Sequence, residues 1–237
     1  MAKRRLISIP ELLTGAFSLY SKVWIQLFVI SVLTVAVWKI WQLVVIPWLL
    51  VVTGLTSLTA GMATGDIAAA ISIGTVGLII FLVSWFIVFM VGFLGSAGMI
   101  IALEARVKGR KKSLGEIFSQ AQKYVLALIF NGIVVFLLEF LGFVLLVIPG
   151  IVLVFLLSFV NFAVVVDRKS GFSAVGRSIS LVRKNFLGMV GRMIFIGLIS
   201  FLINLYFGKM PLYHFISQTI LLPFTITYHF LLYKDVA

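Results

Sequence analysis

The stretch that decides the fold runs from Ile67 to Leu103 and reads IAAAISIGTVGLIIFLVSWFIVFMVGFLGSAGMIIAL, without a single Asp, Glu, Lys or Arg. A second stretch, Tyr124 to Val166, holds one such residue, Glu139. About 20 helical residues cross the roughly 30 Å hydrocarbon core of a bilayer. Both stretches exceed that length, and a chain that is 62% hydrophobic with mean hydropathy +1.24 has no soluble core that would bury them. The sequence therefore predicts an integral membrane protein.

Helices account for these stretches better than a β-barrel, because the apolar runs are continuous instead of alternating. We predict an all-α, polytopic fold with about six transmembrane helices in one membrane domain, residues 1–237. The helices form three hairpins, and an amphipathic helix on the cytoplasmic side precedes each hairpin. The predicted spans are Val23–Trp41, Val76–Leu103, Tyr124–Val147, Ile151–Val166, Phe186–Phe207 and Leu212–Tyr233.

Two connections between these spans have distinctive compositions. Pro149-Gly150 is the predicted helix break between the third and fourth spans, since proline lacks an N–H donor and glycine frees the backbone. The segment Thr53–Ser72, rich in Gly, Thr, Ala and Ser, is predicted to be the one long loop on its side of the membrane.

The basic residues are distributed unequally about the spans. Seventeen of the 19 Lys and Arg residues fall on one side, and Lys39 and Lys209 fall on the other. Basic segments are retained in the cytoplasm, so this asymmetry predicts a plasma-membrane protein with both termini inside. The formal net charge of +12 follows from the basic cytoplasmic loops that fix membrane topology, and it suits the anionic inner leaflet. We therefore expect no nucleic-acid partner. The absence of cysteine excludes disulfides and thiolate metal sites.

Three amphipathic segments lead into spans: Ser8–Lys22, Ser113–Tyr124 and Ser173–Phe186. The first two begin with Ser-x-x-Glu, a capping box in which the serine and the glutamate satisfy each other's backbone donors. Apolar residues recur three and four positions apart, opposite basic residues. This pattern favours helices that lie in the plane of the headgroups. The alternative, that the segments are the cytoplasmic ends of long membrane helices, stays open.

One ordered set of motifs runs through the chain: Pro10-Glu11-Leu12-Leu13, Val147-Ile148-Pro149-Gly150-Ile151, Phe162–Asp167, Gly171–Ala174, Arg177-Ser178 and Leu181–Phe186. This set resembles the membrane domain of glycerophosphoryl diester phosphodiesterases and its stand-alone bacterial and archaeal relatives. The resemblance implies a prokaryotic membrane module without the catalytic barrel of the fused enzymes, and therefore no catalytic residue, metal or cofactor.

Ionisable residues inside a span are costly, so each is a functional candidate. Glu139 lies at a depth similar to Lys39, and we expect either a pair between them or a protonatable Glu139 in a pathway. A neutral Glu139 bonded to a neighbouring helix is the alternative, and Asn204 supplies an amide at similar depth. Nearer the inner face, four further polar residues are candidates to converge: Asn131, Asn161, Arg192 and Glu104.

Lipid-headgroup contacts are expected from the basic clusters, namely from Arg183, Lys184, Arg177, Lys111 and Lys112. For Arg192 we expect snorkelling to the interface, and the alternative is a lipid phosphate held between Arg192 and Arg183. The small residues of Gly92-x-x-Gly95-x-x-Gly98 favour close helix packing within the chain over a dimer interface.

The residues for enzyme chemistry are absent from the sequence. His214 and His229 are fifteen residues apart on one span, about 22 Å at 1.5 Å per residue, so they cannot share a metal. We therefore predict a non-enzymatic membrane protein with a basic cytoplasmic face that engages lipid headgroups or another membrane protein. The alternatives are a small transporter or channel that uses intramembrane polar residues such as Glu139, and an intramembrane enzyme acting on lipids.

Overall fold

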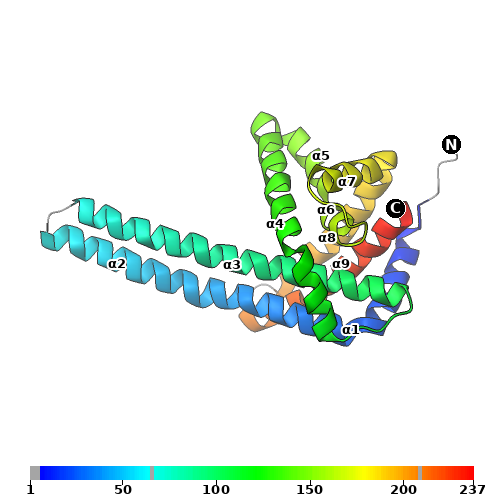
Figure 1. Cartoon of the computed structure of the whole chain (residues 1–237), viewed down its shortest axis with the longest axis horizontal. Helices are drawn as coiled ribbons and strands as arrows, with labels where there is room; N and C mark the ends of the chain where they lie inside the picture. The colour runs from blue at the N-terminus through cyan, green and yellow to red at the C-terminus, as the bar shows by residue number, and fades with distance from the viewer. Residues whose placement is uncertain (1–5, 65–66, 208–209) are drawn as a thin grey trace. The chain divides into compact units, whose positions relative to one another are not determined.

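The computed structural model describes residues 6–64, 67–207 and 210–237. This part of the chain is helical and contains no strand, which confirms the all-α fold (Figure 1). The elements are α1 (Ile9–Ile40), a π-helix η1 (Trp41–Val45), α2 (Ile46–Thr64), α3 (Ile67–Val107), α4 (Leu114–Leu145), α5 (Val147–Leu157), α6 (Val160–Val165), α7 (Phe172–Lys184), α8 (Phe186–Phe207) and α9 (Pro211–Val236).

Six helical stretches in the described residues are long and apolar enough to cross a membrane, as predicted. The chain is therefore a multi-pass membrane protein. Its arrangement as three hairpins with in-plane helices stays a prediction. The six stretches are Ile9–Gly54, Thr75–Val107, Leu114–Leu145, Val147–Val165, Phe186–Phe207 and Leu212–Val236.

The chain divides into two compact units, each of which is described by itself. The first comprises Met1–Val32 and Phe93–Ala237, and the second comprises Leu33–Gly92. The prediction of a single membrane domain over residues 1–237 is neither confirmed nor contradicted by this division.

The second unit pairs η1 and α2 with α3. The Trp41 indole donates a 3.1 Å hydrogen bond to the Ser84 hydroxyl, and Gly77 lies so close to Thr53 that a Cβ at Gly77 would clash with it. The loop predicted at Thr53–Ser72 is wrong, because its described residues belong to α2 and α3. Threonine hydroxyls here donate back to carbonyls of the preceding turn, as Thr53 does to Leu49 at 2.6 Å, so a polar composition is compatible with a helix.

The three amphipathic segments join their spans in two different ways. Val23 (φ −131°, ψ 17°) interrupts α1, and Asn185 (φ −138°, ψ 47°) separates α7 from α8. The second segment instead continues into its span as one helix, α4. Both predicted capping boxes are confirmed, with the backbone N–H of Ser8 donating to Glu11 at 2.9 Å and that of Ser113 donating to Glu116 at 2.7 Å.

The apolar faces of these segments pack against protein. The first two segments share one register, because the residues four and eight positions after the capping serine are buried: Leu12 and Ala16, and Ile117 and Ala121. Helix α7 packs against α5 and α6 and buries Ala174, Val175, Ser178, Leu181 and Val182. The apolar face of α7 is therefore occupied by the protein core, and its opposite, basic face remains exposed.

Helices α4 and α5 form a hairpin whose bend lies earlier than predicted (Figure 1). The break is at Leu146, which is extended (φ −163°, ψ 145°), and Pro149-Gly150 lies inside the first turn of α5. Proline is tolerated there because the first N–H groups of a helix have no partner within it. Gly142 and Gly150 instead let α4 and α5 approach each other closely, since a Cβ on Gly142 would lie 3.0 Å from the Cα of Gly150.

The predicted fourth span is two helices, α5 and α6, with a break at Ser158-Phe159. The Ser178 hydroxyl, from α7, closes this break. It accepts the Phe159 N–H at 3.1 Å and donates to the Leu156 carbonyl at 2.6 Å. Because Ser178 is fully buried, the freed backbone groups of the break are satisfied away from water.

Candidate functional site

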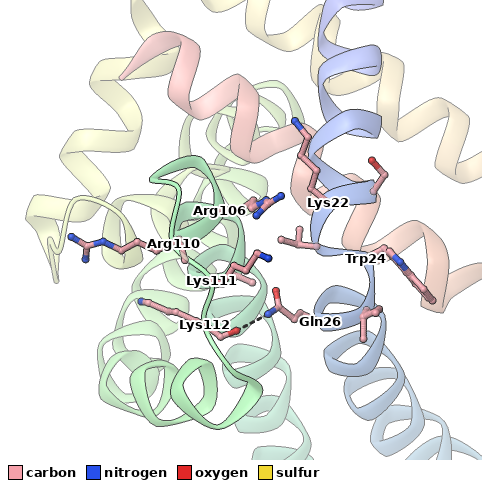
Figure 2. A pocket seen from close by; sticks show the side chains of 12 residues that line it. Lys22, Trp24, Gln26, Arg106, Arg110, Lys111 and Lys112 are labelled. Atoms are coloured by element: carbon pink, nitrogen blue, oxygen red, sulfur yellow. Dashed lines mark hydrogen bonds between the residues drawn. The ribbon is translucent and has the colours of Figure 1, made fainter.

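A pocket of about 390 Å³ opens in the first unit between the kinked part of α1 and the connection from α3 to α4 (Figure 2). Basic side chains and apolar walls share its lining, and no acidic side chain contributes to it. The lining residues are Ser21, Lys22, Val23, Trp24, Ile25, Gln26, Ala102, Ala105, Arg106, Arg110, Lys111 and Lys112.

The end of α3 builds one wall of the pocket. Gly109 has a positive φ of 71°, its N–H donates to the Arg106 carbonyl at 3.0 Å, and the next N–H, of Arg110, donates to the Ala105 carbonyl at 2.8 Å. These two bonds form a Schellman motif, in which glycine adopts the left-handed conformation without a Cβ penalty. The chain thereby turns back along α3, and Gln26 of α1 holds it by donating to the Lys112 carbonyl at 2.6 Å.

None of the five cations of the pocket has an ion-pair partner among the residues that the structure describes. Lys22, Arg106 and Lys111 make no side-chain hydrogen bond or ion pair with any residue that the structure describes. Figure 2 shows Arg106 and Lys111 between α1 and the 106–112 segment and Lys22 extending from α1 above them, whereas Arg110 and Lys112 point away on the other side. An anion placed among the first three would gain attraction without breaking an existing pair.

The two remaining basic residues also line a smaller pocket of about 90 Å³. There the charges are partly compensated, since Glu104 pairs with Lys108 at 2.6 Å and the Lys112 ammonium is hydrogen-bonded to Gln120. The two pockets differ in that an acidic side chain, Glu104, lines the smaller one and none lines the larger one.

The apolar side of the larger pocket is formed by Val23, Trp24, Ile25, Ala102 and Ala105. Val23 begins the first predicted span and Ala102 lies at the end of the second, so the pocket sits where membrane helices give way to polar chain. Trp24 is 51% exposed, as is typical of the aromatic side chains that lie at headgroup level. A pocket that is cationic on one side and apolar on the other suits the headgroup of an anionic lipid.

Arg192 is bonded within the chain. Its guanidinium donates to the carbonyls of Ile7 at 2.6 and 2.9 Å, Leu6 at 3.4 Å and Gly188 at 2.8 Å. These bonds hold the segment before α1 against α8. They occupy most of the Arg192 donors that a lipid phosphate between Arg192 and Arg183 would need.

The headgroup candidates of α7 have separate surroundings. Arg177 forms an ion pair with Asp167 at 2.7 Å and also donates to the Ala237 carbonyl at 3.1 Å. Burial lowers the pKa of Arg177, the hydrogen bond and charge of Asp167 raise it, and the net shift is upward. Arg183 and Lys184, in the last turn of α7, are exposed.

The intramembrane candidates are placed as follows. Glu139 is half-buried on α4 in the first unit, and no hydrogen bond or ion pair joins it to another described residue. Lys39 belongs to the second unit, where its ammonium lies 3.5 Å from the Gln42 side-chain oxygen. The pair predicted between Glu139 and Lys39 crosses the two units and stays a prediction.

The polar residues predicted to converge near the inner face have separate partners. Asn131 is fully buried and donates to the Ala127 carbonyl at 2.7 Å, while its own side-chain oxygen lacks a partner among the described residues. Asn161 is half-buried on α6. Glu104 and Arg192 have the partners given above. No hydrogen bond within the described residues joins these four side chains to one another.

Asn204 belongs to a polar seam between α8 and α9 that we did not predict. The Gln218 amide donates to the Asn204 side-chain oxygen at 2.7 Å and lies 3.3 Å from His214, and Ser200 lies 3.4 Å from Thr225. The signal was present in the sequence, because residues 200 and 204 on one span and 214 and 218 on the other are each four apart and share a helix face.

Of the small residues predicted to pack closely on α3, Gly98 lies against other helices of the chain, whereas a Cβ on Gly92 would meet nothing within 4 Å. A Cβ on Gly98 would lie 3.5 Å from both Ile30 and Ile117.

Among the residues that the structure describes, no group of three or more His, Asp or Glu side chains is placed to hold a metal ion.

Comparison with known proteins assigns no family to this arrangement. The chain matches no protein-family model, no curated protein and no solved structure. The site must therefore be interpreted from its own geometry.

Proposed function

We propose that this multi-pass membrane protein is non-enzymatic and binds the headgroups of anionic lipids in the pocket between α1 and the α3–α4 connection. The observation that carries the proposal is that Lys22, Arg106 and Lys111 share a pocket with apolar walls and have no ion-pair partner among the described residues.

The electrostatic energy supports a specific site over diffuse attraction. A basic residue near an anionic leaflet contributes about 1 kcal/mol. Lys22 and Lys111 are exposed, so solvent holds each of their contacts to about 1 kcal/mol or less, whereas the half-buried Arg106 is less screened. Three cations around one headgroup therefore bind it more strongly than the same cations spread over a surface.

The distribution of basic residues supports the inner leaflet of the plasma membrane as the location. Seventeen of 19 lie on the side of the pocket, so we propose cytoplasmic termini. The cysteine-free chain allows a direct test with the exposed residues Ser170 and Met62. In intact cells, an impermeant maleimide is expected to label Met62→Cys, and Ser170→Cys only after permeabilisation. The reverse pattern would overturn the orientation.

The lipid proposal is tested by native mass spectrometry of the purified full chain. Wild type is expected to retain anionic lipid that the double variant Arg106→Gln/Lys111→Gln loses. The matched control is Lys123→Gln/Lys169→Gln, which removes two exposed basic residues outside the pocket. Equal retention by the two double variants would contradict the proposal.

The resemblance to the membrane domain of glycerophosphoryl diester phosphodiesterases supports the same conclusion. We propose that the chain is a stand-alone module of that kind, without a catalytic barrel. Such a module acts through binding, either of lipid alone or of lipid together with another membrane protein.

A transporter or channel is the second candidate, and the break between α5 and α6 favours it, because discontinuous helices line many transport sites. Closure of the break by Ser178 makes it the weaker candidate. Proteoliposomes containing a pH-sensitive dye provide a test for proton movement. A flux that Glu139→Gln or Gln218→Leu abolishes would favour transport over lipid binding.

A further inference from the structure

We infer that the pocket selects a lipid phosphomonoester, a headgroup with two negative charges, over phosphodiester and zwitterionic lipids. This inference rests on the proposed function and specifies its ligand class. Three features of the pocket support it: the number of cations, their origin in three places of the chain, and the lack of acidic side chains in the lining.

The number of charges favours a dianion. A phosphomonoester carries a charge of about −1.5 to −2 at neutral pH, whereas a phosphodiester carries about −1. Nearby cations lower the second pKa of a phosphomonoester and thereby favour its dianionic form. The combined charge of Lys22, Arg106 and Lys111 exceeds what one phosphodiester charge neutralises, and a second negative charge removes more of their mutual repulsion.

The geometry favours a terminal phosphate. Lys22 lies on α1, Arg106 on the last turn of α3 and Lys111 on the connection to α4, so the donors approach from different sides (Figure 2). A terminal phosphate offers three free oxygens as strong acceptors, and Arg106 can bind two of them with its planar fork. A phosphodiester offers two free oxygens, because the other two carry carbon substituents.

The lining disfavours headgroups that contain an amine. None of the twelve lining residues is Asp or Glu, so the ammonium of a zwitterionic lipid would meet only cations. In the smaller pocket Glu104 supplies a carboxylate, but Lys108 already occupies it at 2.6 Å. An ammonium headgroup therefore finds no carboxylate to pair with in the larger pocket.

The apolar wall favours a lipid over a soluble phosphate. Val23, Trp24 and Ile25 continue directly into the membrane part of α1, and Ala102 continues into α3. Acyl chains attached to the phosphate would lie along these helices. A free phosphate ion would use the cations and leave the apolar wall unused.

The test is native mass spectrometry of the full chain in detergent, titrated separately with phosphatidic acid, phosphatidylglycerol and phosphatidylcholine of equal chain length. Phosphatidic acid is expected to bind about tenfold more tightly than phosphatidylglycerol, which corresponds to about one additional charge-assisted contact. Phosphatidylcholine is expected to bind more weakly than both. Inorganic phosphate is added at increasing concentration in a parallel series.

The variants separate the two levels of the proposal. Arg106→Gln/Lys111→Gln is expected to reduce the preference for phosphatidic acid to less than about twofold, while Lys123→Gln/Lys169→Gln retains it. Equal binding of phosphatidic acid and phosphatidylglycerol to wild type, with both lost in the pocket variant, would overturn the monoester inference and leave the proposed function standing. Binding of either lipid that is unaffected by the pocket variant would overturn the proposed function itself.

Two further results complete the interpretation. Displacement of phosphatidic acid by inorganic phosphate at comparable concentration would identify a free phosphate as the ligand and overturn the lipid assignment. Should the double variant elute as an aggregate, Lys22→Gln provides the same comparison from the α1 side of the pocket, because Lys22 is exposed and makes no side-chain bond within the described residues.

Discussion

The Ser31 hydroxyl of α1 donates a 2.8 Å hydrogen bond to the Thr219 carbonyl of α9, and both residues are buried. Thr219 is four residues before Pro223, which lies inside α9 and has no N–H to donate. The carbonyl left without its helical partner is therefore satisfied by a side chain 188 residues away. In a membrane interior no water replaces a lost partner. This bond therefore joins α1 to α9 and also satisfies the carbonyl of α9 that Pro223 leaves without a donor.

We expect Ser31→Ala to destabilise the protein by about 1–3 kcal/mol, because a buried carbonyl loses its donor. In a Pro223→Ala background the restored N–H satisfies Thr219, and the cost of Ser31→Ala should fall below about 0.5 kcal/mol. Unfolding in mixed detergent micelles measures both steps of this double-mutant cycle. Additive effects would show that Ser31 does not compensate for the proline.

Ser178→Ala is expected to lower the free energy of unfolding by about 2 kcal/mol, since the Phe159 N–H and the Leu156 carbonyl both lose their partner. Ser180→Ala, two residues further along α7, is the matched control because Ser180 is exposed. Its effect should stay within about 0.5 kcal/mol. If both variants unfold alike, the break between α5 and α6 does not depend on Ser178.

Arg177→Gln should affect stability and leave lipid binding unchanged. Its partly buried ion pair with Asp167 is lost, at a cost of about 1.5–3 kcal/mol for a hydrogen bond to a charged group. Arg183→Gln, which removes an exposed charge from the same helix, should leave the free energy of unfolding nearly unchanged. Lipid retention measured beside unfolding distinguishes these roles, and selective loss of lipid in Arg177→Gln would refute this assignment.

Arg192→Lys is expected to loosen the segment before α1, although the charge is kept. Lysine lacks the planar fork that reaches the Leu6 and Ile7 carbonyls together. Limited proteolysis at residues 6–8 should accelerate about tenfold, equivalent to about 1.4 kcal/mol. Lys184→Ala serves as the control on an exposed position. Unchanged proteolysis of Arg192→Lys would show that the three carbonyl contacts do not hold the segment before α1 in place.

The features that sequence reasoning recovered are local. Apolar run lengths predicted the helices, and the Ser-x-x-Glu spacing predicted both capping boxes because a capping box is complete within four residues. The break at Pro149-Gly150 was misplaced, since proline fits the first turn of a helix as well as a turn between helices. The Thr53–Ser72 segment was misread because threonine satisfies its hydroxyl inside a helix.

The candidate site was predicted only in part. Lys111 and Lys112 were among the expected headgroup residues, but their neighbour Lys22 comes from a segment 84 residues before Arg106 and joins them only through the fold. The sequence also cannot distinguish Arg177 and Arg192, whose donors are used within the chain, from Arg106, whose side chain makes no hydrogen bond with a described residue. That distinction depends on partners that are remote in sequence.

The bend between α4 and α5 has a consequence for membranes of different thickness. Its single connecting residue, Leu146, has both backbone groups bonded, the N–H to Gly142 at 3.1 Å and the carbonyl to Gly150 at 3.3 Å. From Phe140 to Leu157 no side chain is polar, so no side chain at this end of the hairpin requires water. A bilayer that thins or thickens meets a hairpin end whose side chains set no preferred depth, while the cations beside α1 stay with the headgroups.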